Sequence, residues 1–224
     1  MHHESFRVEF SGDLVAVQGD LVAMTTAAAE AIREATTVLL DGRDDADRDN
    51  RIVRLQERIE GLRGAVEQRT HQLLARQQPV AGDLRLLVAA LRISADAARM
   101  SRLASHIGQI AARRRPAAVV PAPVVGVVAG MGELAYRIAD GAASTLAAGD
   151  AQDAARLEVD DDSMDELLRQ LFAALLDAWP HGVESAVDLA LVGRYYERFA
   201  DHAVAIAASV VFIVSSRPDP SGLL

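Results

Sequence analysis

Residues 10–40 read FSGDLVAVQGDLVAMTTAAAEAIREATTVLL, and the spacing of the apolar side chains in this stretch decides the fold class. These side chains follow one another in steps of four and three, which places them in a single stripe along an α-helix. They are Phe10, Leu14, Val17, Leu21, Met24 and Ala28. The stretch therefore predicts a long helix that faces a core, and Asp41-Gly42 after it is typical of a left-handed helix stop.

The rest of the chain continues the helical pattern. A second helix is expected to run toward Arg76, a third to close at the arginine run 113–115, and a fourth to follow a proline-containing linker. A fifth is expected to reach about Trp179, and a sixth to end before Ser215. Because no β-rich alternating stretch occurs, the sequence predicts an all-α fold of six long helices.

The two halves of the chain resemble each other. Gly149-Asp150 repeats the first stop, and a proline precedes the last helix of each half. The triplet Arg99-Met100-Ser101 resembles Arg198-Phe199-Ala200. We therefore expect two pseudo-symmetric three-helix bundles, over residues 1–115 and 116–224, in one compact unit.

Composition limits the function classes. A net charge of −9 argues against general affinity for nucleic acid, which depends on basic groups. The absence of cysteine excludes disulfides and thiolate metal sites, and it suits the cytoplasm. The start of the chain does not resemble a secretory signal, and residues 117–132 are interrupted by prolines and glycines, so a linker leading into a helix is expected there rather than membrane insertion.

Two further segments each have two interpretations. The arginine run 113–115 stands at a predicted helix C-terminus, where cations complement the helix dipole, and the alternative is a contact with an anion or a partner. Residues 203–214, AVAIAASVVFIV, are apolar on every side. Such a helix is buried either within its own bundle or against another chain, and we favour a dimer or transporter contact.

Acidic side chains of the second half are the candidate metal ligands. Glu197 and Asp201 stand four residues apart, so they share one helix face, where their charges repel unless a cation lies between them. Asp161, Asp162 and Asp165 of the preceding helix supply further oxygen atoms. Spacing alone leaves open whether these acids bind metal or form a solvated helix face.

The order of helices, the segment 77–85 (QQPVAGDLR) and the segment 197–203 (ERFADHA) resemble the PhoU family of phosphate-specific transport accessory proteins. The resemblance extends from about Phe6 to Ser215. It implies a cytoplasmic negative regulator of phosphate uptake and phosphate signalling, and the apolar residues 203–214 lead us to expect a homodimer. Such a regulator would be an adaptor between the ATPase subunit of the phosphate ABC transporter and a sensor histidine kinase.

The resemblance also implies metal binding through an acid-x-x-x-Asp motif on the third helix of each half. Glu197 and Asp201 match this motif, whereas the first half has Ala98 and Arg102 at the same positions. We therefore expect at most one metal site, in the second half, for iron, zinc, manganese or magnesium. Our hypothesis for the first half is that Arg102 replaces the cation by pairing with Glu57 or Glu60.

Two other functions are compatible with a helical fold of this kind. A metal-dependent helical di-iron enzyme would need paired Glu-x-x-His elements, which this sequence lacks, so no catalytic residue is expected. The alternative to a phosphate regulator is a metal-free helical module for dimerisation or interaction, derived from the same family.

Overall fold

The computed structural model describes residues 2–42, 46–76, 79, 81–149 and 154–214, which form six long helices without a strand among them. The helices are α1 (His2–Asp41), α2 (Ala46–Arg76), α3 (Ala81–Arg114), α4 (Val125–Ala148), α5 (Ala154–Leu176) and α6 (Val183–Val214). A short 3₁₀ turn, η1 (Ala122–Val124), precedes α4. The predicted all-α fold of two three-helix bundles is confirmed.

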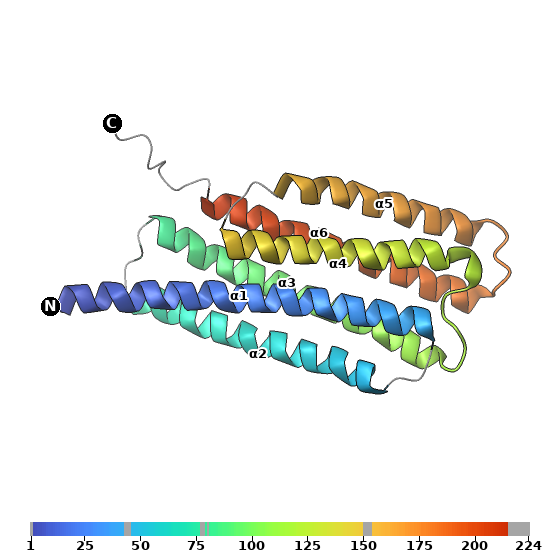
Figure 1. Cartoon of the computed structure of the whole chain (residues 1–224), viewed down its shortest axis with the longest axis horizontal. Helices are drawn as coiled ribbons and strands as arrows, with labels where there is room; N and C mark the ends of the chain where they lie inside the picture. The colour runs from blue at the N-terminus through green and yellow to red at the C-terminus, as the bar shows by residue number, and fades with distance from the viewer. Residues whose placement is uncertain (1, 43–45, 77–78, 80, 150–153, 215–224) are drawn as a thin grey trace.

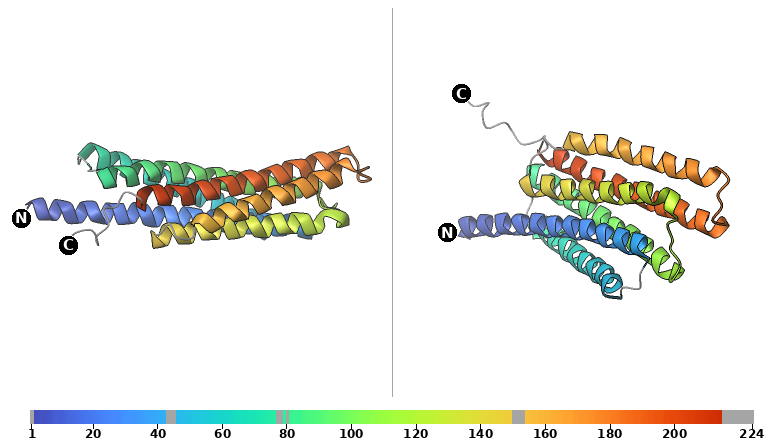
Figure 2. Two further views of the ribbon diagram at one scale, coloured as in Figure 1. Left: turned by 90° about the horizontal axis from the view of Figure 1, so that it is seen from above. Right: turned by 45° about the vertical axis from the view of Figure 1, so that its right-hand side comes forward.

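The two bundles lie side by side along the long axis of the molecule. Figure 1 shows α1 to α3 on one side and α4 to α6 on the other, and the right-hand view of Figure 2 shows the same division. Across the boundary, α1 packs against α4 and α3 packs against α6. We call these two packed surfaces the seam.

The helix ends follow the predicted turn chemistry, with one exception. Gly42 (φ 61°) and Gly149 (φ 62°) both adopt the left-handed conformation that favours glycine, as the sequence predicted. However, α5 ends at Leu176, about one turn before the expected position near Trp179. Ala178 has a φ of 44°, so the chain has already left the helical conformation before it reaches Pro180.

The apolar stripe of α1 lies at the centre of the first bundle. Val17, Leu21, Met24 and Ala28 are fully buried, because α1 is enclosed by α2, α3 and α4. Burial of a large apolar side chain contributes about 1.5–3 kcal/mol, so this stripe is a main source of stability. Leu14 is partly buried against the same core, whereas the side chain of Phe10 lies outside the described residues.

Residues 117–132 form a linker that leads into a helix, as the sequence predicted. The linker and the 3₁₀ turn η1 extend to Val124, and α4 starts at Val125. By length and composition alone, residues 122–148 are apolar enough to cross a membrane. Met131, Ile138 and Ala142 are nevertheless buried inside the bundle, as in a core helix.

At the seam, a glycine of α4 lies directly against α1. A Cβ atom on Gly132 would lie 2.3 Å from Cγ2 and 2.6 Å from Oγ1 of Thr36. The Thr36 hydroxyl donates to the Ile32 carbonyl (2.7 Å) and therefore accepts from the Tyr196 hydroxyl of α6 (2.8 Å). Tyr196 is fully buried, which raises the pKa of its hydroxyl. Thr36 thus links three helices at one point.

The arginine run at the end of α3 connects both halves. Arg114 donates to Glu184 (2.8 Å) and to Asp188, both on α6 of the second bundle. Arg115 pairs with Asp49 on α2 of the first bundle. Two of the three arginines therefore have structural partners within the chain, in agreement with the structural interpretation.

The apolar end of α6 is buried on one side only. Ala203, Ile206, Ala207 and Val210 are enclosed by the bundle. Among the described side chains of this segment, Ala205, Ala208, Val211 and Phe212 are exposed. The bundle therefore covers one face of the segment, and the contact of the other face with a second chain stays a prediction.

Candidate metal site

Glu197 lies on α6, and its carboxylate is largely enclosed. The side chain is only 14% exposed, and Oε1 accepts a hydrogen bond from Arg194. Oε2 is buried and has no hydrogen-bond partner within the described chain. An unsatisfied, buried carboxylate oxygen is costly, so this atom is chemically suited to hold a cation.

The electrostatic surroundings of Glu197 disfavour its charged form. Burial raises the pKa of this carboxyl above its ordinary value, and the negative charge of Asp201 raises it further. Asp165 of α5 acts in the same direction, whereas Arg194 partly compensates. Two further sequence-predicted residues, Asp201 and Asp165, therefore act on the Glu197 carboxylate through their charge.

The remaining predicted acids lie on the same stretch of α5. Asp162 is exposed one turn before Asp165, and the side chain of Asp161 lies outside the described residues. Asp160 lies 3.7 Å from Arg137 of α4 and is thereby directed toward that helix. Among the predicted ligands whose side chains the structure describes, Glu197 is the one with an enclosed, unpartnered oxygen and neighbouring acids.

The carboxylate oxygens near Glu197 suit a hard cation, but the described side chains do not form a complete coordination shell. Carboxylate oxygens are the ligands that magnesium, manganese and iron accept, and a cation would remove both the repulsion and the unsatisfied oxygen. Among the side chains that the structure describes, no three from His, Asp and Glu converge closely enough to form a ligand set.

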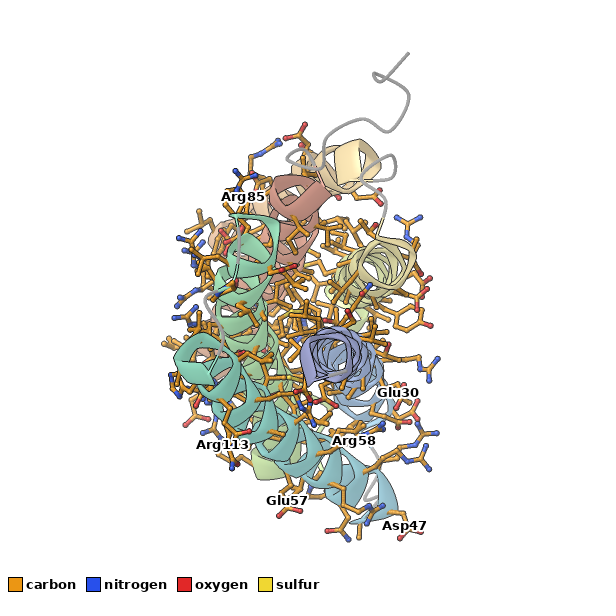
Figure 3. All side chains as sticks on the ribbon, turned by 90° about the vertical axis from the view of Figure 1, so that its left-hand side faces the viewer. Glu30, Asp47, Glu57, Arg58, Arg85 and Arg113 are labelled. Atoms are coloured by element: carbon orange, nitrogen blue, oxygen red, sulfur yellow. The ribbon has the colours of Figure 1, made fainter. Side chains whose placement is uncertain are left out.

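The first bundle has a different arrangement at the equivalent positions. Ala98 is fully buried, and Arg102 donates to Glu60 of α2 at 3.1 Å. Glu60 also lies 3.5 Å from Arg63. The hypothesis that Arg102 pairs with an acid of the second helix is confirmed for Glu60. Glu57, the other candidate partner, points outward (Figure 3).

One polar contact across the seam was not predicted from the sequence. Asp96 of α3 lies 3.2 Å from Nδ1 of His202 on α6 and 2.9 Å from Arg99. His202 thus faces the opposite bundle rather than its neighbour Asp201. No local signal could have found this pair, because the two residues meet only through the packing of α3 against α6.

Comparison with known proteins places the chain in a family. The model of the PhoU domain matches residues 21–111 and 128–210, one stretch in each half. The phosphate-specific transport system accessory protein PhoU homolog 1 of Mycobacterium tuberculosis is 40% identical over 210 residues, covering 93% of this chain and 94% of that protein. PhoU homolog 2 of the same organism is 42% identical over 183 residues, covering 81% and 85%.

Solved structures agree on the fold. The crystal structure of PhoU from Pseudomonas aeruginosa superposes with a TM-score of 0.80 at 23% identity, covering 92% of this chain and 99% of that one. The phosphate transport system regulatory protein PhoU from Streptococcus pneumoniae gives 0.77 at 17% identity, covering 94% and 99%. From the duplicated bundles, the domain matches and these relatives, the chain belongs to the PhoU family of phosphate transport accessory proteins.

Proposed function

We propose that this protein is a cytoplasmic negative regulator of phosphate uptake and phosphate-responsive signalling. It would act as an adaptor between the ATPase subunit of a phosphate ABC transporter and a sensor histidine kinase. The observation that carries the proposal is the likeness to accessory proteins of phosphate transport systems over nearly the whole chain, in both halves. An adaptor acts by contact and needs no catalytic residue.

The acidic cluster of the second bundle gives this adaptor one regulatory or structural cation. Glu197 would supply its enclosed Oε2, and Asp201 and Asp165 would supply further oxygens. In the first bundle the Arg102 guanidinium occupies the corresponding position of the motif, so no second cation is expected there. Iron, manganese, magnesium and zinc are all candidates, because oxygen ligands discriminate weakly among them.

Metal content tests the cation site. Elemental mass spectrometry of the untagged protein should detect a stoichiometric metal in the wild type and none in the double variant Glu197→Ala with Asp201→Ala. Asp83→Ala, which removes an acid at the start of α3, is the matched control and should keep the metal. A folded, helical wild type without metal after purification in metal-supplemented buffer would contradict the proposal.

The adaptor role needs a separate experiment. Deletion of the gene should leave the phosphate response switched on in phosphate-rich medium, and the intact gene should restore repression. Purified protein should also bind the ATPase subunit and the kinase of its own host in a binding assay with immobilised partner. Normal repression in the deletion strain would contradict negative regulation, and absence of binding to both partners would contradict an adaptor.

A second candidate function is a metal-free interaction module. The Arg102–Glu60 pair favours this alternative, because in the first bundle the arginine supplies the positive charge that a cation would supply at the equivalent motif. If the second half also lacks metal, the protein would function through contacts alone. Binding to the transport partners in the presence of a chelator, equal to binding without it, would support this alternative.

A further inference from the structure

The charge of this chain is unevenly distributed among its helices. Together, α2 and α3 carry 13 arginines and 7 acidic residues, which gives the two helices a net charge of +6. Because the whole chain carries −9, the remaining residues carry −15. Two adjacent basic helices therefore belong to a strongly acidic protein, and the net charge of the whole chain conceals this contrast.

Much of the positive charge lies along the outer face of α3. Five arginines share this face: Arg85, Arg92, Arg99, Arg102 and Arg113. They follow one another in steps of seven, seven, three and eleven residues, each close to a whole number of helical turns, so they form one stripe about 42 Å long. Arg85 is partly exposed, and the other four are exposed. Figure 3 labels Arg85 and Arg113 at the same edge of the molecule. We call this row the arginine stripe.

No exposed acid of α3 compensates the arginine stripe. The two acids of this helix are Asp83 and Asp96. Asp83 lies in the first turn and is partly buried. The side chain of Asp96 is only 14% exposed, and it contacts Arg99 and, across the seam, His202 of α6. The exposed charges of α3 are therefore all positive.

Three arginines of the stripe are available for a partner. Arg102 pairs with Glu60 of α2. In contrast, Arg85, Arg92 and Arg113 have no ion-pair partner in the part of the chain that the structure describes. The planar guanidinium group is weakly hydrated and can bind a carboxylate through two hydrogen bonds, so it suits an ion pair at an interface.

An aromatic pair lies beside the arginine stripe. The ring centroids of His106 on α3 and Tyr195 on α6 are 5.3 Å apart. His106 is exposed and stands between Arg102 and Arg113 along the helix, and Tyr195 is partly exposed. Arginine and tyrosine are enriched at protein–protein interfaces and among the residues that contribute most to binding. The composition of this face is therefore typical of a contact with another protein.

We propose that the arginine stripe docks onto an acidic surface of a partner protein. This inference rests on the proposed adaptor function, and it adds the face and the chemistry of one of the adaptor's contacts. The three unpaired guanidinium groups would each pair with a carboxylate of the partner. Complementary charge of this kind speeds association and helps to select the partner. The acids elsewhere on the chain would repel the same surface, so the partner would meet α3 rather than another helix.

The overall charge argues against two other classes of anionic occupant. A nucleic acid or an anionic membrane carries negative charge over an area much larger than one helix. Either would also meet the part of the chain that carries −15 and would be repelled by it. A protein can present a confined acidic patch along the arginine stripe alone. The charge distribution therefore favours a protein partner.

Charge reversal of the three unpaired arginines tests the proposal. The binding assay uses the full-length chain with the immobilised ATPase subunit and the immobilised sensor kinase of its own host. The triple variant Arg85→Glu, Arg92→Glu and Arg113→Glu should bind at least one of these partners about 30-fold more weakly than the wild type. An increase in salt from about 0.1 M to about 0.5 M should weaken wild-type binding and reduce the difference between wild type and variant.

A second triple variant controls for net charge. Arg33→Glu, Arg137→Glu and Arg169→Glu change the charge by the same amount at exposed positions on α1, α4 and α5. This control variant should bind both partners as tightly as the wild type, and circular dichroism should show that both triple variants are folded. Equal weakening by the two variants would overturn the proposal, because net charge alone would then explain the loss.

Three other outcomes would also overturn the proposal. If the wild type binds a partner and the stripe variant binds both partners equally well, the docking face is wrong and the adaptor function stands. If the wild type binds neither partner, both the adaptor function and the docking face are contradicted. Tighter binding of the wild type to vesicles of phosphatidylserine and phosphatidylcholine, or to a DNA duplex, than to either protein would assign the arginine stripe to a different class of occupant.

Discussion

The close approach of α4 to α1 at Gly132 allows a quantitative prediction for Gly132→Ala. The new Cβ atom would lie 2.3 Å from Cγ2 of Thr36, where carbon atoms normally remain about 3.5–4.0 Å apart. The helices must therefore separate by more than 1 Å, or Thr36 must leave its rotamer. Overpacking of this kind costs about 1–3 kcal/mol.

Two further contributions affect the total. Displacement of Thr36 disturbs its hydrogen bond with Tyr196, which is worth about 1 kcal/mol. Alanine is the better helix former by about 1 kcal/mol, and this gain offsets part of the cost. We therefore expect a net loss of about 1–3 kcal/mol in the free energy of unfolding.

Urea denaturation followed by circular dichroism measures this loss. With an m-value of about 3 kcal/mol/M, the midpoint should fall by roughly 0.3–1 M. Gly130→Ala is the matched control on the same helix, because its Cβ would meet Leu167 at an ordinary 3.6 Å. That control should be as stable as the wild type or more stable. Equal midpoints for the two variants would refute the reasoning, and Thr36→Ala should reduce the cost of Gly132→Ala in a double-mutant cycle.

Three further predictions concern polar groups. In metal-free protein at pH 7, Glu197→Gln should raise the thermal midpoint, because it removes a buried negative charge. Burial raises the pKa of Glu197, so the wild-type carboxyl becomes protonated, and the wild type more stable, as the pH falls through that pKa. The difference in thermal midpoint between wild type and variant should therefore shrink in acid. Arg102→Ala should cost no more than about 1 kcal/mol in urea denaturation, because the Arg102–Glu60 pair is half-exposed, and 0.5 M salt should abolish most of the effect. Tyr196→Phe should lower the free energy of unfolding by about 1 kcal/mol, because it removes the hydrogen bond that the Tyr196 hydroxyl donates to Thr36. The loss is no larger because Thr36 still donates to the Ile32 carbonyl. An unchanged midpoint in urea denaturation would show that the Tyr196 hydroxyl contributes nothing to stability.

The sequence predicted those parts of the fold that depend on local patterns. The apolar spacing of α1 identified its buried face, and Gly42 and Gly149 marked turns that need a positive φ. These features follow from helix periodicity and backbone sterics, which act over a few residues. The end of α5 was misplaced, because nothing local shows that the chain leaves the helix before Pro180.

Contacts between distant helices were predictable only in part. The Arg102–Glu60 pair could be anticipated because the duplicated motif had lost its acids on one side and gained a cation. The contact of Asp96 with His202 could not, since it depends on how α3 lies against α6. For the same reason, the sequence could not show which face of the apolar run 203–214 is covered, and the structure buries one face and exposes the other.

The Arg102–Glu60 pair makes the two halves of the molecule differ in how far their charge balance depends on metal ions in solution. In the first half the positive charge is covalently attached, so no chelator and no shortage of metal can remove it. High ionic strength weakens it. In the second half, Arg194 is the cationic partner that the structure gives Glu197, and the negative charges of Asp201 and Asp165 act against the Glu197 carboxylate. If the second half holds the proposed cation, the duplicated chain combines one half that is insensitive to metal supply with one half whose charge balance depends on it.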